Sequence, residues 1–167
     1  MTDQPMAAGA LRNRGTARGL AAPDATMCFV GAMLALGVAT VHVADQGGVT
    51  ALTSPDWIGW GYRLIEVGGV LSALVLLLSP LAPRSLAWAG WAAGALLGTG
   101  PFVAYILSRS VGVPGDPGDV GHWGYWVGTV SLLIEAALVV LSVRMLLALR
   151  RSAGRSGGRS LSWQGEG

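Results

Sequence analysis

The sequence carries little charge and contains no lysine, since all eleven of its basic residues are arginine. Charged residues make up 12% of its 167 positions, hydrophobic residues make up 52%, and the mean hydropathy is +0.55. About a quarter of the residues of an ordinary soluble domain are charged. The composition therefore excludes an ordinary soluble fold and indicates a protein whose main solvent is lipid.

Cysteine is nearly absent as well. The single Cys28 excludes an internal disulfide, a CxxC redox pair and a cysteine metal cluster, and we interpret it as a small packing residue. The sequence also lacks an HExxH motif, a phosphate-binding loop and a recognisable nucleophile–base pair. We therefore expect a protein that is not an enzyme and that has no cofactor.

Long apolar runs are what the sequence does contain. At about 1.5 Å per residue, about twenty apolar residues in a helix match a hydrocarbon core of roughly 30 Å, whereas strands are excluded by length and by the missing alternation. We expect an all-α membrane protein, a compact bundle of four helices within residues 25–149, with Pro101 kinking the third helix. The four expected spans are residues 25–44, 57–78, 85–107 and 122–143.

The positions of the arginines predict the orientation of the bundle. Arginines precede the first span, follow the fourth and occupy the short turn between the second and third. Of the other two connections, one has no arginine and the other is bordered only by Arg109. By the positive-inside rule, both termini lie in the cytoplasm and residues 45–56 and 108–121 lie outside, in a multi-pass plasma-membrane protein whose first span is uncleaved. Residues 1–24 and 150–167 are rich in Gly, Ser, Ala and Arg, and we expect disordered cytoplasmic tails there.

Small residues mark the expected helix contacts, because membrane helices gain packing energy where their backbones approach closely. The third span has glycine at four-residue spacing, and the fourth has a stripe of small residues that leads to its one acid. The residues expected at these contacts are Gly90, Gly94, Gly98, Gly124 and Gly128.

Ionisable residues inside the spans are costly and mark candidate sites. Arg63 and Glu66 are three residues apart and are expected to pair on one helix face. Glu135 then lacks a counter-ion, and it would share its depth with Glu66 if the second and fourth helices touch. Either a proton or a bound cation should balance the charge of Glu135. Two interpretations of these three residues stay open: a proton- or cation-binding site, or a polar clamp in which protonated Glu135 bonds across helices.

A second group of polar residues lies at the expected outer face. His42 and His122, together with Asp45, Asp116 and Asp119, could form a metal site, and the two histidines could ligate haem. No HxH or HxxxH spacing supports a metal, and solvated loop acids together with a capping histidine are the alternative. We expect Asp119 to cap the fourth helix.

One stretch of the chain resembles a known group of proteins. "SRSVGVPGDPGDVGHWG", followed by "SLLIEAALVVLS", is similar to the last helix hairpin of small four-span membrane proteins of high-GC bacteria, which are generally uncharacterised; "GYRLIEVGGVLSALVLLL" resembles them more weakly. The resemblance implies a multi-span membrane protein and no particular activity.

Three hypotheses for the function follow. The first is a non-enzymatic membrane protein that acts through helix contacts with itself or with a membrane partner. The second is proton or cation handling by Arg63, Glu66 and Glu135, and the third is a metal or haem site at His42 and His122. We expect the lipid bilayer and no nucleic acid as a partner.

Overall fold

A computed structural model describes residues 24–51 and 55–157, the side chains of residues 154–157 excepted. The tails expected at residues 1–23 and 158–167 lie outside the described residues. Four helices in the described part are long and apolar enough to cross a membrane. They are α2 (Ala25–Asp45), α3 (Asp56–Leu78), α4 (Arg84–Ser110) and α5 (Trp126–Gly157), with the short 3-10 helices η1 (Ser79–Leu81) and η2 (Pro117–Asp119) between them.

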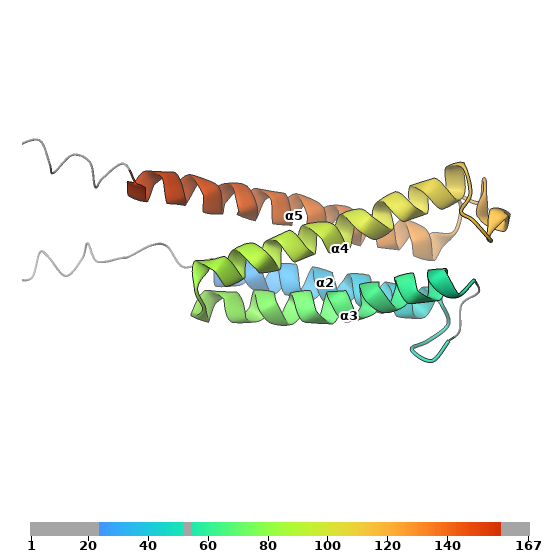
Figure 1. Cartoon of the computed structure of the whole chain (residues 1–167), viewed down its shortest axis with the longest axis horizontal. Helices are drawn as coiled ribbons and strands as arrows, with labels where there is room; N and C mark the ends of the chain where they lie inside the picture. Colours follow the sequence, from blue (N-terminus) through green and yellow to red (C-terminus); the bar gives the residue numbers. More distant parts are fainter. Residues whose placement is uncertain (1–23, 52–54, 158–167) are drawn as a thin grey trace, which may run out of the picture.

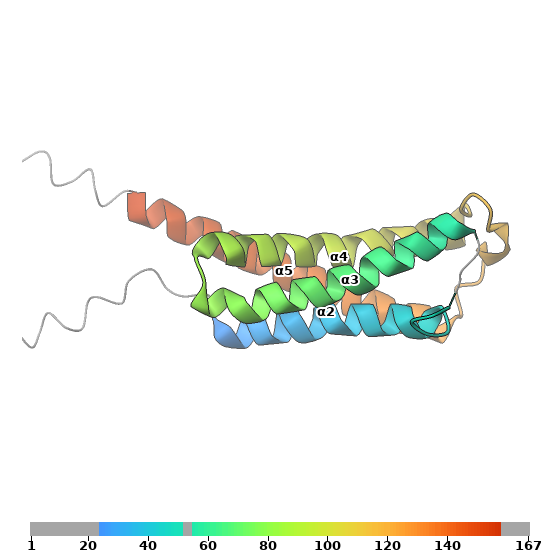
Figure 2. The same ribbon diagram turned by 60° about the horizontal axis from the view of Figure 1, so that its bottom comes forward.

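The helices run antiparallel along one long axis (Figures 1 and 2). Each packs against its two neighbours in the ring α2–α3–α4–α5, and α3 makes no contact with α5 within the described residues. Glu66 on α3 and Glu135 on α5 therefore do not meet, and the condition for these two acids to form one group is not fulfilled. We call the end with the 111–125 connection the loop end, and the end with Arg84 the arginine end.

Local sequence explains where the helices begin and end. The Asp24 side chain accepts a hydrogen bond from the Thr26 amide at 3.0 Å and starts α2. Pro55 and Pro83 directly precede α3 and α4, where proline is tolerated because the first helical turn needs no amide donor from it. The turn between α3 and α4 is correspondingly short, as expected. Helix α4 continues through Pro101.

Helix α5 differs from its expected bounds at both ends. It begins at Trp126 instead of His122, because Gly121 has a φ of +82° and interrupts the chain before it. It also continues to Gly157, so residues 150–157, expected in the disordered tail, are helical. Two contacts with α4 hold this extension: Arg150 lies over the Trp88 ring at 5.6 Å, and Arg84 donates to Ser152 at 2.7 Å.

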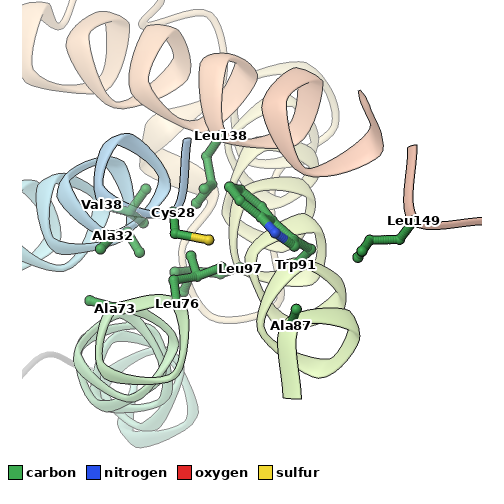
Figure 3. Packing of buried hydrophobic residues seen from close by; sticks show 11 residues of the cluster. Cys28, Ala32, Val38, Ala73, Leu76, Ala87, Trp91, Leu97, Leu138 and Leu149 are labelled. Atoms are coloured by element: carbon green, nitrogen blue, oxygen red, sulfur yellow. The ribbon is translucent and has the colours of Figure 1, made fainter. Parts of the chain in front are cut away.

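The apolar core fills the half of the bundle nearer the arginine end. The Trp91 ring reaches from α4 toward Leu138 of α5, with Cys28 and Leu76 beside it (Figure 3). Trp91 is fully buried, and its ring packs against Gly31 of α2. Cys28 is a buried free cysteine, in the packing position expected for it.

The glycines of α4 allow close helix contacts within the bundle. A Cβ atom added at Gly90 would meet Val75 of α3 at 3.0 Å, and one at Gly94 would meet the Ser142 hydroxyl of α5 at 2.9 Å. At Gly98 it would lie 2.8 Å from the Glu135 carbonyl oxygen. The stripe therefore packs against α3 and α5 and is not free to contact another protein.

The two glycines expected in the fourth span differ from each other. Gly128 is buried against the Tyr105 ring of α4. Gly124 lies in the connection before α5, is exposed, and has nothing within 4 Å of an added Cβ, so the packing role expected for it is wrong.

Gly98→Ala is expected to lower the free energy of unfolding by about 1–3 kcal/mol, as overpacking in a tight interface does. The added methyl group would meet backbone atoms of α5, which cannot move aside as a flexible side chain can. Gly100→Ala on the same helix is the matched control, because nothing lies within 4 Å of its Cβ position. Denaturant titration in mixed micelles measures both variants, and equal stability of the two would show that α4 and α5 do not approach at Gly98.

Candidate functional site

A cavity of about 370 Å³ occupies the half of the bundle nearer the loop end. Helices α3 and α4 diverge toward this end (Figure 1). All four helices and the 111–125 connection contribute to its walls, from Trp57 and Asp116 near the surface to Glu135 in the interior. Its volume lies within the range of sites that hold small molecules, roughly 300–1,000 Å³.

Glu135 and His42 meet at the inner part of this cavity. The His42 Nε2 atom lies 3.7 Å from Oε1 of Glu135, and the side chains are 11% and 1% exposed. Helical side chains lean toward the N-terminus of their helix. Because α2 and α5 run in opposite directions, His42 leans inward from the loop end and Glu135 leans toward it. This geometry gives Glu135 a titratable neighbour that the sequence did not indicate.

The hydrogen bonds around this pair define its protonation chemistry. His42 Nδ1 lies 2.9 Å from the Val38 carbonyl oxygen. A carbonyl only accepts, so Nδ1 carries hydrogen and Nε2 is the nitrogen that gains or loses a proton. The Ser131 hydroxyl donates to Glu135 Oε1 at 2.5 Å, whereas Oε2 is buried with no hydrogen-bond partner among the described residues.

Carboxylates and aromatic rings surround the outer part of the cavity. Tyr62 donates a hydrogen bond to Asp45 at 2.5 Å. Tyr125, which precedes α5, also lines the cavity, and its partial burial together with its hydrogen bond to Asp45 and that carboxylate's charge raises the pKa of the hydroxyl. Trp57 donates to the Pro114 carbonyl oxygen at 3.2 Å and so ties α3 to the 111–125 connection.

Arg109 at the end of α4 is the one buried arginine side chain among the described residues. It forms an ion pair with Asp119 and lies over the Tyr105 ring at 5.0 Å. Its carbonyl oxygen accepts from the Gly121 amide at 2.9 Å. Asp119 therefore fixes the connection to α4 and does not cap α5, so the capping prediction is wrong.

Arg63 and Glu66 pair as expected, at 2.8 Å, but they lie outside the cavity. Arg63 also donates to the Ala51 carbonyl oxygen at 2.9 Å, and Gln46 donates to Glu66. These contacts tie the connection between α2 and α3 to the helix that follows it. The intramembrane polar residues predicted as one group are therefore two: this clamp, and the separate pair of Glu135 with His42.

The outer polar residues do not assemble as a metal site. No group of three or more potential metal-ligating side chains is present in residues 24–51 and 55–157. His122 is exposed, and its Nδ1 lies 2.8 Å from the Gly118 carbonyl oxygen. His42 lines the cavity and His122 does not, so the hypothesis of a shared metal or haem site at these two histidines has no geometric support.

Sequence reasoning missed three residues of the site. Arg109 was noted only as a charge that borders a connection, and Tyr105 and Tyr62 were not among the candidate residues. The stripe of small residues in the fourth span was a signal for Tyr105, because small residues leave space for a large side chain of a neighbouring helix. The Tyr105 ring fills the space that Gly128 leaves.

Comparison with protein-family models, with curated proteins and with solved structures finds no match for this chain. The resemblance to small four-span membrane proteins therefore stays a prediction, and the function is argued from the geometry of the cavity.

Proposed function

We propose that the chain is a non-enzymatic, multi-pass plasma-membrane protein that handles protons at the His42–Glu135 pair, within a cavity open to the outer side. The observation that carries this proposal is the position of Glu135. Its side chain is 1% exposed and has one oxygen without a partner in the described part of the chain, yet it lines a cavity that extends to the surface residues of the loop end.

The orientation is part of the proposal and rests on the arginines. Arg84, Arg144, Arg150 and Arg151 lie toward the arginine end of the helices. The two described arginines nearer the loop end, Arg63 and Arg109, are each paired with an acid. The positive-inside rule then places the arginine end and both termini in the cytoplasm. The cavity consequently opens away from the cytoplasm.

A single proton can reside on either member of the pair, whose nearest atoms are 3.7 Å apart. With one proton, either neutral histidine faces a carboxylic acid or an imidazolium faces a carboxylate, and the pair is neutral overall in both cases. Loss of that proton would leave an uncompensated carboxylate in a low-dielectric interior, at a cost of several kcal/mol. The other titratable or charged groups of the cavity come from every element around the pair: Asp45, Tyr62, Tyr105, Arg109, Asp116, Asp119 and Tyr125.

Action through helix contacts alone, the first of the sequence hypotheses, has less support. Glycines could bring a helix of another protein close to α4, but those of the 90–98 stripe pack against α3 and α5 of the same chain. A clamp between helices would also not require a cavity beside Glu135.

Infrared difference spectroscopy of the protein in bilayers tests this proposal. Between about pH 4 and about pH 9, which brackets the unperturbed glutamate and histidine values, the protein should show carboxyl signals that vanish in Glu135→Gln. Gln keeps the shape of the side chain and can still bond to Ser131, so the variant should fold.

Glu66→Gln is the matched control, because Glu66 pairs with Arg63 outside the cavity. Its difference spectrum should retain the signals lost in Glu135→Gln. An unchanged spectrum in Glu135→Gln would show that this residue exchanges no proton, and Glu135 would then be a structural hydrogen-bonding group.

A further inference from the structure

The outer part of the cavity has more negative charge than the protein balances. Asp119 is paired with Arg109. Asp45 accepts from Tyr62, but no arginine or histidine side chain in the described part of the chain forms a salt bridge with Asp45 or Asp116. Both carboxylates line the same cavity, so it offers two acids without a protein cation.

Aromatic rings lie beside these acids. Trp57, Tyr62 and Tyr125 line the cavity together with Asp45, and the faces of such rings attract cations. One contact of this kind already exists in the cavity, where Arg109 lies over the Tyr105 ring at 5.0 Å. Carboxylates combined with ring faces suit an ammonium group, whereas Ca²⁺ and Mg²⁺ prefer six or more oxygen ligands.

We propose that this cavity binds a small organic cation, a protonated amine or a quaternary ammonium compound, from the outer side. Asp45 and the surrounding rings hold the charged group, and the unpartnered Glu135 Oε2 accepts a hydrogen bond from the inner end of the ligand. The cavity volume of about 370 Å³ accommodates a molecule of this kind. The inference rests on the proposed proton site, because the same cavity connects Glu135 to the outer side.

Calorimetric titration of the full-length protein in detergent tests the ligand class. The probes are choline and ethanolamine, each at constant ionic strength, and the control ligand is 3,3-dimethylbutan-1-ol, which has the shape of choline without its charge. At least one cation should bind saturably. The affinity for the neutral alcohol should be at least about tenfold lower, which corresponds to roughly 1.4 kcal/mol of binding free energy. Saturable binding of neither cation, equal binding of choline and the alcohol, or the same response to sodium chloride alone would overturn the proposal.

Asp45→Asn tests the site within the protein. Asparagine still accepts the Tyr62 hydrogen bond but has no charge, so the affinity for the bound cation should fall at least about tenfold. Asp56→Asn is the control, because Asp56 is exposed at the start of α3 and does not line the cavity; its affinity should match that of the wild-type protein. An equal loss in both variants would point to general surface charge and would contradict the assigned site.

The two proposals can fail separately. Glu135-dependent infrared signals without cation binding would leave the proton site standing and remove the organic ligand. Cation binding with no Glu135 signal would do the reverse: the ligand site would stand and the proton site would be removed.

Discussion

Trp91→Ala is expected to lower the free energy of unfolding by about 3 kcal/mol. Deleting a fully buried aromatic side chain costs about 3–5 kcal/mol in soluble proteins, where a hydrophobic transfer term adds to the cost of the void. Between helices in lipid that transfer term is largely missing, because the lipid tails are as apolar as the core. The lost packing remains, and we therefore expect the lower end of the range.

Trp88→Ala on the same helix is the matched control, since Trp88 is 36% exposed and its ring contacts Arg150 instead of the core. It should cost less than about 1 kcal/mol, the size of an exposed cation–ring contact. Denaturant titration in mixed micelles measures both variants. Similar losses would show that the bundle does not close around Trp91.

The position of Trp91 also explains how the fold supports the cavity. Its ring fills the space between α2, α4 and α5 near the arginine end, where Gly31 allows it to approach the α2 backbone. Gly98 closes α4 onto α5 at the Glu135 carbonyl. From that contact toward the loop end, a cavity replaces the close packing. The packed half near the arginine end therefore holds the four helices together, and the half near the loop end carries the polar site.

The sequence predicted the elements of this fold because each depends on local patterns. Run length and hydropathy located four helices, and the glycine spacing of α4 indicated its contact faces. The end of α5 was missed because Arg84 and Arg150 act through contacts between distant segments, Arg84 with Ser152 and Arg150 with Trp88, and composition alone had indicated a disordered tail.

The candidate site was harder to predict because it depends on which helices are neighbours. Arg63 and Glu66 lie on one helix, so their spacing was enough to predict the pair. His42 and Glu135 lie on different helices, and counting charges could show only that Glu135 needed a partner. The order of the helices around the ring, which places α2 beside α5, determines that partner, and nothing in the sequence of either helix specifies that order.

Arg109→Ala is expected to lower the free energy of unfolding by about 2–3 kcal/mol. Breaking a fully buried ion pair costs about 3–5 kcal/mol, because the remaining charge loses its partner without regaining water. Here the Arg109 side chain is 9% exposed but that of Asp119 is 40% exposed, so water partly compensates the stranded carboxylate and the cost is smaller. The contact with the Tyr105 ring is lost as well.

The position of the loss distinguishes this effect from general destabilisation. Because Arg109 holds the 111–125 connection through Asp119, hydrogen exchange in Arg109→Ala should rise in that connection before it rises in the core half of the bundle. Arg150→Ala is the matched control, an exposed arginine that also lies over an aromatic ring, and it should leave exchange at the loop end unchanged. Uniformly faster exchange along all four helices in Arg109→Ala would show that Arg109 supports the whole bundle instead of fixing the outer wall of the cavity.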